Sequence, residues 1–266
     1  MMARRNWLTS ALAAGASAAL PGAAPAAIAV AASPSRPASR PAFRPPLEWE
    51  QIESFRGVVT KQVELRYLAW MPDPALKPTD GWPLVIFLHG SGERGRNLEK
   101  VKSHGPPMYA AAGRRFPFVL IAPQVEDGDS WHSDEIEALR ADLVARLPID
   151  ADRVLVTGMS MGGYGAWNFA VAYPEQVAAI APVCGIGNVE RAGRVAQVPV
   201  WAFHGARDSV VPIAADREMV EAVRAAGGRV RFTVYPEVGH NAWDRAYADP
   251  ALYAWLLAQR RARSAR

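Results

Sequence analysis

Mostly apolar segments alternate with amphipathic segments along the greater part of this 266-residue chain. Runs that suit buried strands lie at Leu84–Leu88, Phe118–Ala122, Arg153–Thr157, Val177–Val183, Val198–Phe203 and Val230–Tyr235. Between them, the spacing of apolar residues predicts helices at about Asp134–Arg146, Gly163–Ala172, Ile213–Ala226 and Pro250–Gln259. This order of elements predicts an α/β fold, in which helices cover both faces of a mostly parallel sheet.

Two earlier segments, 55–60 and 62–70, have the alternation typical of strands, and we predict that they pair antiparallel at the sheet edge. No repeat, second domain or long insertion interrupts the pattern between residues 48 and 259. We therefore expect one domain over 48–259, with an open site and no large lid.

The N-terminal residues are typical of an export signal. Arg4-Arg5-Asn6-Trp7-Leu8 is similar to a twin-arginine motif, and an alanine-rich apolar stretch follows it to Ala32. An uncleaved membrane anchor is the alternative, but Pro21, Pro25 and the weak hydrophobicity of alanine argue against a stable spanning helix. We expect a signal peptide over 1–32, a Pro/Arg-rich linker over 33–47, and a periplasmic or extracellular mature protein without stable membrane insertion.

The distribution of charge argues against a nucleic-acid partner. The sequence has 30 basic and 26 acidic residues, for a formal net charge of +4. Nine arginines lie in two segments that contain no acid, 1–47 and the basic tail 260–266. The body therefore keeps 21 basic and 26 acidic residues, a net charge of −5, and lacks the excess of basic residues that a nucleic-acid-binding face requires.

A serine flanked by glycines follows the Arg153–Thr157 strand and precedes a predicted helix. In Gly158-Met159-Ser160-Met161-Gly162, a turn this tight leaves no room for side chains two residues either side of Ser160. Such a turn exposes the serine hydroxyl at the carboxyl end of a parallel strand. Ser160 is therefore a candidate nucleophile.

Two residues farther along the chain complete the chemistry that a serine nucleophile needs. Asp208 follows the Val198–Phe203 strand, and His240 follows the Val230–Tyr235 strand. Because a hydroxyl is a poor nucleophile at neutral pH, Ser160 needs His240 to accept its proton, and His240 needs a carboxylate to orient its ring. Glu237 is the nearest alternative acid, but the chain order Ser, Asp, His favours Asp208.

A glycine-rich turn, His89-Gly90-Ser91-Gly92, ends the Leu84–Leu88 strand. Small residues there allow the main chain to approach a developing oxyanion. We expect the N–H groups of Met161 and of Ser91 or Gly92 to form an oxyanion hole.

The chain resembles a known group of hydrolases in four segments: HGSGERGRNLEKVKSHGPP, VLVTGMSMGGYGAWNFAVAYPEQVAAIAPVCG, VPVWAFHGARDSVVP and YPEVGHNAWDRAYADPALYAWL. These segments resemble the prolyl-oligopeptidase-like and dienelactone-hydrolase-like carboxylesterases. They are most similar to the bacterial "predicted peptidase" group, which borders the feruloyl esterases and polyhydroxybutyrate depolymerases. The resemblance covers about residues 50–259 and implies an α/β-hydrolase fold and a serine hydrolase of ester or related acyl bonds.

Several other reactive residues have structural interpretations that we favour. Ser91 is expected to act through its backbone, and His89 and His204 to hydrogen-bond nearby backbone atoms. The single cysteine, Cys184, ends a buried strand with no base near it in sequence, which favours a buried thiol over a nucleophile. His104 and His132 have no partner that the sequence identifies. No group of residues shows metal-ligand spacing, so we expect neither a metal nor a cofactor.

Trp131 and Trp243 lie in loops expected at the carboxyl end of the sheet. With nine tryptophans in the chain, a core or surface role is the alternative for each. An exposed indole beside His240 would suit an aromatic or sugar-linked substrate, which offers an apolar face.

These observations predict an exported serine esterase that acts on a small-molecule or polymer-linked carboxylic ester through an acyl-enzyme intermediate. A serine peptidase of the prolyl-oligopeptidase type is the enzymatic alternative, although the body leaves no room for a propeller domain. A non-catalytic binding protein with a hydrolase fold is the alternative from a different class.

Overall fold

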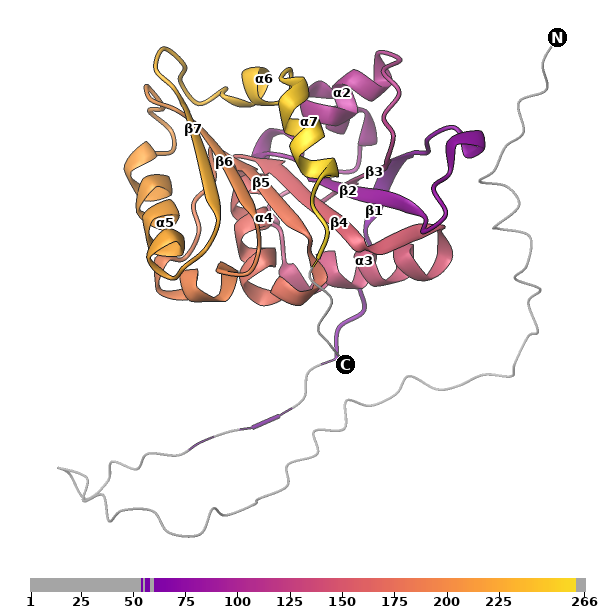
Figure 1. Ribbon diagram of the computed structural model, residues 1–266, viewed down its shortest axis with the longest axis horizontal. Coiled ribbons are helices and arrows are strands. Elements are labelled where there is room, and N and C mark those ends of the chain that lie inside the picture. The colour runs from indigo at the N-terminus through magenta and orange to yellow at the C-terminus, as the bar shows by residue number, and fades with distance from the viewer. Residues whose placement is uncertain (1–53, 55, 58–59, 262–266) are drawn as a thin grey trace. The chain divides into compact units, whose positions relative to one another are not determined.

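The computed structural model describes residue 54, residues 56–57 and residues 60–261 (Figure 1). The chain divides into two units after Gln62, and the unit that begins at Val63 contains every helix and strand reported below. The predicted signal peptide and linker, residues 1–32 and 33–47, lie outside the described residues.

Seven strands form one open sheet in the order β1-β3-β2-β4-β5-β6-β7. The strands are β1 Arg66–Trp70, β2 Trp82–Leu88, β3 Val119–Gln124, β4 Ile149–Met159, β5 Ala179–Val183, β6 Val200–Gly205 and β7 Val230–Tyr235. β1 runs antiparallel to β3, and all other neighbouring strands pair in parallel. The predicted α/β fold with a mostly parallel sheet is confirmed.

Helices cover both faces of this sheet (Figure 1). One layer contains α3 Ser133–Arg146, α4 Met161–Ala172 and α5 Ile213–Ala225, and the other contains α2 Gly105–Ala111, α6 Trp243–Ala246 and α7 Pro250–Leu257. Short 3₁₀ helices occur at η1 Pro74–Leu76, η2 Ser91–Glu93, η3 Leu98–Ser103, η4 Pro174–Gln176 and η5 Val189–Val195.

Alternate residues of the central strands fill two separate cores. On β2, Leu84, Ile86 and Leu88 are fully buried and pack with residues of α3, α4 and α5. The intervening Val85 and Phe87 pack with residues of α6 and α7. Each such side chain contributes about 1.5–3 kcal/mol on burial. Burial on both faces explains why the strand is apolar at every position.

The edge of the sheet differs from the sequence-based prediction. The second of the two predicted edge strands is shorter, Arg66–Trp70, and pairs with β3, where Arg66 lies opposite Gln124. Its predicted partner, segment 55–60, lies partly outside the described residues, and its described positions are not in a strand. The alternation in the second segment therefore predicts a strand correctly. Its pairing with β3 depends on residues distant in sequence, which no local pattern shows.

Residues Arg260 and Arg261, the first two of the predicted basic tail, contact the end of the sheet opposite the predicted site. Arg260 pairs with Asp150 at 2.6 Å and Arg261 pairs with Asp152 at 2.8 Å, both at the start of β4. They border a hollow of about 1110 Å³. In the part of the chain that the structure describes, no helix has the length and apolar character needed to cross a membrane.

Candidate active site

The predicted nucleophile occupies a tight turn between β4 and α4. Ser160 has φ 51° and ψ −118°, a backbone conformation that residues other than glycine rarely adopt and that costs about 1–3 kcal/mol. Its amide donates to the carbonyl of Val183 at 2.8 Å, so the end of β5 supports the turn. The turn places Ser160 at the carboxyl end of the sheet.

Both flanking glycines are required by close approach of the backbone. A Cβ atom on Gly158 would lie 2.4 Å from the carbonyl oxygen of Gly162, and one on Gly162 would lie 1.9 Å from the carbonyl oxygen of Leu88. Both distances are far below van der Waals contact, so the steric explanation given by the sequence is correct. The second contact also brings the first turn of α4 directly against the end of β2.

The structure brings together the three residues predicted to carry the chemistry. His240 Nδ1–H donates to Asp208 Oδ2 at 2.7 Å. The Ser160 hydroxyl donates to His240 Nε2 at 2.9 Å. In this arrangement the imidazole can accept the serine proton while the carboxylate holds its tautomer.

Hydrogen bonds hold both oxygens of the Asp208 carboxylate. Oδ1 accepts from the amides of Val210 and Val211 at 2.9 and 2.8 Å, and Oδ2 accepts from His240. Burial by itself raises the pKa of Asp208, but these hydrogen bonds outweigh burial and leave the pKa below its ordinary value. Asp208 is therefore ionised at neutral pH and can stabilise an imidazolium at His240.

The alternative acid, Glu237, lies on the surface with its side chain 65% exposed and pairs with Arg207. His240 Nδ1–H donates instead to Asp208, in the loop after β6. The geometry therefore selects Asp208 for this position.

The backbone predicted for the oxyanion hole lies on the two sides of the contact between β2 and α4. Ser91 and Gly92 begin η2, which follows β2 after two residues, and Met161 is the first residue of α4. Because Gly162 packs against the main chain of Leu88, the Met161 amide and the turn after β2 are neighbours. Arg94 supports the same region, since its Nη2 lies 3.0 Å from the Met161 sulfur.

A cavity of about 350 Å³ lies beside the Ser160 hydroxyl. It is lined by Ser130, Trp131, Ser160, Met161, Tyr164, Gly165 and Asn168. Besides Ser160, three of these residues offer hydroxyl or amide groups, and the indole and the methionine supply apolar surface. None of them carries a formal charge, so the cavity is suited to a neutral substrate group that combines apolar and hydroxyl-bearing parts.

Trp131 lies both in the core and at the wall of the cavity beside Ser160. Its side chain is 6% exposed, packs in the core and donates its indole N–H to the carbonyl of His89 at 2.9 Å. It also lines the cavity beside Ser160. A Cβ atom on Gly165 would lie 2.8 Å from the Trp131 Cβ, so this close packing fixes the position of the indole.

Trp243 contacts the predicted general base directly. Its ring meets the His240 ring edge-on, with centroids 5.1 Å apart and an interplanar angle of 86°. The His104 ring packs against the indole from another direction, at 5.8 Å. The Trp243 indole N–H is buried without a hydrogen-bond partner among the described residues. Trp243 is therefore placed to orient His240, but it is not among the residues that line the cavity beside Ser160.

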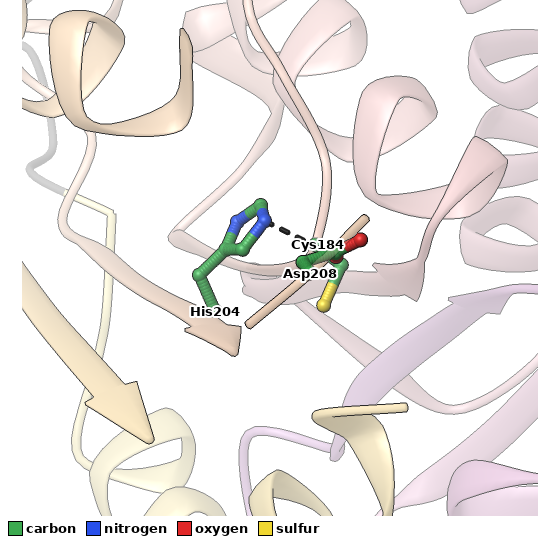
Figure 2. A group of neighbouring side chains, drawn as sticks. All are labelled: Cys184, His204 and Asp208. Atoms are coloured by element: carbon green, nitrogen blue, oxygen red, sulfur yellow. Dashed lines mark ion pairs between the residues drawn. The ribbon is translucent and has the colours of Figure 1, made fainter. Parts of the chain in front are cut away.

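A buried group of three polar side chains lies behind the triad residues. Cys184, His204 and Asp208 each place one polar atom within 4.8 Å of the others (Figure 2). The Cys184 thiol donates to the His240 carbonyl at 3.2 Å, and burial raises its pKa to about 12. The thiol is neutral and buried, as expected for a structural cysteine. Because His204 Nε2 faces the Val211 carbonyl at 2.9 Å, it carries a proton and offers no lone pair to a metal ion.

The two histidines expected to be structural are both fully buried. His89 Nε2 accepts from the Val125 amide at 3.2 Å, so its Nδ1 carries the proton and donates to the Gly90 carbonyl at 2.6 Å. Burial lowers the pKa of His89 to about 4, and the ring stays neutral. His204 bonds the Val211 carbonyl as expected, but it also contacts two carboxylates that the sequence did not identify as its partners.

Sequence reasoning missed two residues of the cavity that a simple spacing would have found. Tyr164 and Asn168 lie four and eight residues after Ser160, on the helix that begins at the elbow. Residues four apart share a face of a helix. The pattern therefore contained this signal once Ser160 was assigned to the start of α4.

The chain is similar to known proteins both in sequence and in fold. The family model described as the dienelactone hydrolase family matches residues 116–252. A carboxymethylenebutenolidase-like protein of Salmonella typhimurium is 26% identical over 153 residues, which are 46% of this chain and 57% of that protein. A protein of Oryza sativa subsp. japonica named "Probable inactive carboxylesterase" is 27% identical over 201 residues, 64% of this chain and 82% of its own.

Among solved structures, the crystal structure of a thermostable esterase superimposes with a TM-score of 0.65 and 31% identity, over 75% of this chain and 60% of that one. The chain spans little more than half the length of the carboxymethylenebutenolidase-like relatives that it matches. The fold is that of α/β-hydrolase esterases.

Proposed function

The chain belongs to the dienelactone hydrolase family, and from that premise we propose that it is an exported serine hydrolase that cleaves carboxylic esters. The observation that carries the proposal is the continuous hydrogen-bonded path from Ser160 Oγ through His240 to Asp208. A hydroxyl, a base and an ionised carboxylate in this order are the parts that acyl transfer through serine requires.

The proposed reaction begins when His240 accepts the Ser160 proton and the serine oxygen attacks the ester carbonyl. The tetrahedral oxyanion is stabilised by the N–H groups of Met161 and of Ser91 or Gly92. His240 then donates its proton to the departing alcohol, which leaves an acyl group on Ser160. A water molecule, deprotonated by His240, then attacks the acyl carbon. The bond to Ser160 breaks, the serine oxygen takes the proton back from His240, and the carboxylic acid is released. Asp208 stabilises the imidazolium in both halves of the reaction.

The cavity beside Ser160 supports a neutral substrate with an apolar, hydroxyl-bearing group, such as an aromatic or sugar-linked ester. Trp131 offers an indole, and Ser130, Tyr164 and Asn168 offer hydrogen-bonding groups. A cavity of about 350 Å³ is at the small end of the range for ligand pockets, which suits one ring rather than a polymer segment. A polymer-linked ester would then place the polymer outside the cavity, on the open side of the site.

A non-catalytic role is the competing proposal, and one observation favours it, namely the rice relative named as an inactive carboxylesterase. A fluorophosphonate probe separates the two proposals, because it labels only an activated serine. We expect labelling of the wild-type protein and none of Ser160→Ala. The matched control Ser103→Ala, which alters an exposed serine of η3, should be labelled like the wild type. Absence of label on folded wild-type protein would contradict the enzyme.

Hydrolysis assays then define the bond that is cleaved. We expect activity on p-nitrophenyl esters and methyl ferulate, with at most weak activity on peptide anilides. Ser160→Ala should lose on the order of 10⁶ in turnover, as in other serine triads. Faster cleavage of anilides than of esters would instead support a serine peptidase.

Export is the part of the proposal that rests on residues outside the described range. It is supported by Arg4-Arg5 and the alanine-rich stretch that follows. Replacing both arginines by lysine keeps the charge but removes the pair that a receptor reads. The double variant should remain in the cytoplasm, and its appearance in the periplasm would identify an ordinary secretory signal.

A further inference from the structure

A buried histidine lies directly behind the carboxylate that orients the proposed general base. His204 is at the end of β6 and is fully buried. Its Nε2 lies 3.3 Å from Asp208 Oδ2 (Figure 2). The same oxygen accepts from His240 at 2.7 Å. Asp208 therefore lies between two imidazole rings, one facing the serine and the other facing the core.

A second buried carboxylate holds the far side of the His204 ring. Asp216 is in the first turn of α5, and its side chain is fully buried. Its Oδ2 lies 2.9 Å from His204 Nδ1. A proton must therefore lie between Nδ1 and this oxygen. Because Nε2 also carries a proton, which it donates to the Val211 carbonyl, the ring is an imidazolium whenever the shared proton is on Nδ1.

The surroundings of His204 favour the charged form of the ring. Burial by itself lowers the pKa of His204, but the hydrogen bonds to Asp216 and Val211 and the attraction of Asp216 and Asp208 outweigh it and raise the pKa. The other titratable groups that face this region are Cys184 at the end of β5, Tyr164 on α4 and His240 after β7. Cys184 and Tyr164 have raised pKa values and are neutral. Burial by itself raises the pKa of Asp216, whereas its hydrogen bond with His204 and the attraction of that ring lower it. Asp216 is therefore ionised only through its pairing with the ring, and Asp208 is the other charge that acts on His204.

We propose that His204, held as an imidazolium by Asp216, is a positioning residue of the proposed ester hydrolase that fixes Asp208 and offsets part of its negative charge. This inference rests on the proposed function. His204 does not touch the substrate. It acts on His240 through their shared partner, the Asp208 carboxylate.

The effect on the reaction follows from the sign of the charge. His204 Nε2 and His240 Nδ1 contact the same oxygen at 3.3 and 2.7 Å, so these two nitrogens are at most about 6 Å apart. A positive charge on His204 therefore makes protonation of His240 less favourable. Asp216, on the far side of His204, cancels part of this field. Removing the His204 charge should therefore make His240 easier to protonate and move the acid limb of the pH–rate profile upward by roughly 0.5 to 1 pH unit.

The test is the pH–rate profile of a variant that removes the pair without leaving a buried charge. The double variant His204→Gln/Asp216→Asn replaces the ion pair by two neutral amides of similar size. At pH 7 its kcat for a p-nitrophenyl ester should fall about 1.5- to 3-fold, with KM within about twofold, and most of the loss should be recovered at pH 9. The matched control His132→Gln, at a side chain that is half exposed and paired with Asp129, should keep the wild-type profile.

A purely structural role would lower activity equally at all pH values, and this result would overturn the proposal. A second measurement keeps it falsifiable if the double variant fails to fold. In ¹⁵N spectra of histidine-labelled wild-type protein at pH 8, a neutral ring has one protonated and one unprotonated nitrogen, whereas an imidazolium has two protonated nitrogens. A buried ring in the imidazolium form at pH 8 is expected, and a neutral His204 would overturn the proposal.

The spectrum also separates this inference from the proposed function, because it requires no catalytic activity. A wild-type protein that hydrolyses no ester would remove the reaction, while the charge on His204 would still be read from the spectrum. An active enzyme with a neutral His204 would contradict the positioning role alone.

Discussion

Replacing Gly162 by alanine should damage both the fold and the proposed site. The added Cβ would lie 1.9 Å from the Leu88 carbonyl oxygen, 2.5 Å from its carbon and 2.8 Å from the His89 oxygen. Ordinary contact begins at about 3.4 Å, so α4 and β2 must separate by about 1.5 Å. All three contacted atoms are main-chain atoms of a central strand and the turn after it, and none can rotate away.

The magnitude follows from two opposing terms. Alanine in place of glycine within a helix favours folding by up to about 1 kcal/mol. Overpacking typically costs about 1–3 kcal/mol, and the cost should reach the upper limit here because backbone has to move. The net loss of about 2 kcal/mol corresponds to a decrease of roughly 4–8 °C in Tm for a domain of this size. The same displacement moves the Met161 amide relative to Ser91 and Gly92, and an error of about 1 Å in such a site can reduce kcat/KM about 100-fold.

Thermal unfolding and ester hydrolysis measure the two effects. The matched control is Gly193→Ala, because an added Cβ there would meet nothing within 4 Å. Its Tm and kcat/KM should remain near the wild-type values. A Gly162→Ala protein with wild-type Tm and activity would show that the elbow can relax, and would refute the argument that the two backbones are in fixed contact.

Asp208→Asn should reduce kcat about 10⁴-fold, because an amide offers His240 the wrong hydrogen-bonding group. Glu237→Gln, at an exposed side chain paired with Arg207, should leave kcat within about twofold. The reverse result would assign the acid to Glu237. Activity on a soluble ester should rise between pH 5 and 8 with a single acid limb, because a histidine base accepts the serine proton only in its neutral form. The lowered pKa of Asp208 keeps that carboxylate ionised across this range. A flat profile would exclude a histidine base. Trp243→Ala should reduce kcat/KM about 10- to 100-fold for methyl ferulate, since about 1–3 kcal/mol of aromatic contact is lost, and less for p-nitrophenyl acetate. Equal losses on both esters would mean that the indole only orients His240 and does not contact the substrate. Trp131→Ala should reduce kcat/KM in the same way and should also lower Tm, because the side chain is only 6% exposed and its removal leaves a cavity in the core.

The sequence by itself determined the features that depend on a few neighbouring residues. The run Val230–Tyr235 forms a strand with the predicted bounds, because periodicity and β-branched content act locally. The glycines at 158 and 162 were explained by sterics alone, and the structure confirms the clash. The chain order of Ser160, Asp208 and His240 was sufficient to select three residues that are hydrogen-bonded in the fold.

The short helices α2 and α6 were not predicted, for a physical reason. α2 begins Gly-Pro-Pro and has seven residues, and α6 has four. Helices this short are not stable by themselves. They form because they pack on the folded core, and a local sequence pattern does not indicate where that packing surface lies.

Only the tertiary structure decided which distant segments meet. β1 pairs with β3, a segment far along the chain, because hydrogen bonds between strands are satisfied by whichever partner the whole sheet places alongside. His204 was expected to bond only backbone, yet it also contacts Asp208 and Asp216, since α5 packs Asp216 against the end of β6. The sequence contains the nucleophile, acid and base in the order Ser160, Asp208 and His240. The buried charges behind Asp208 depend instead on packing between elements that no local rule connects.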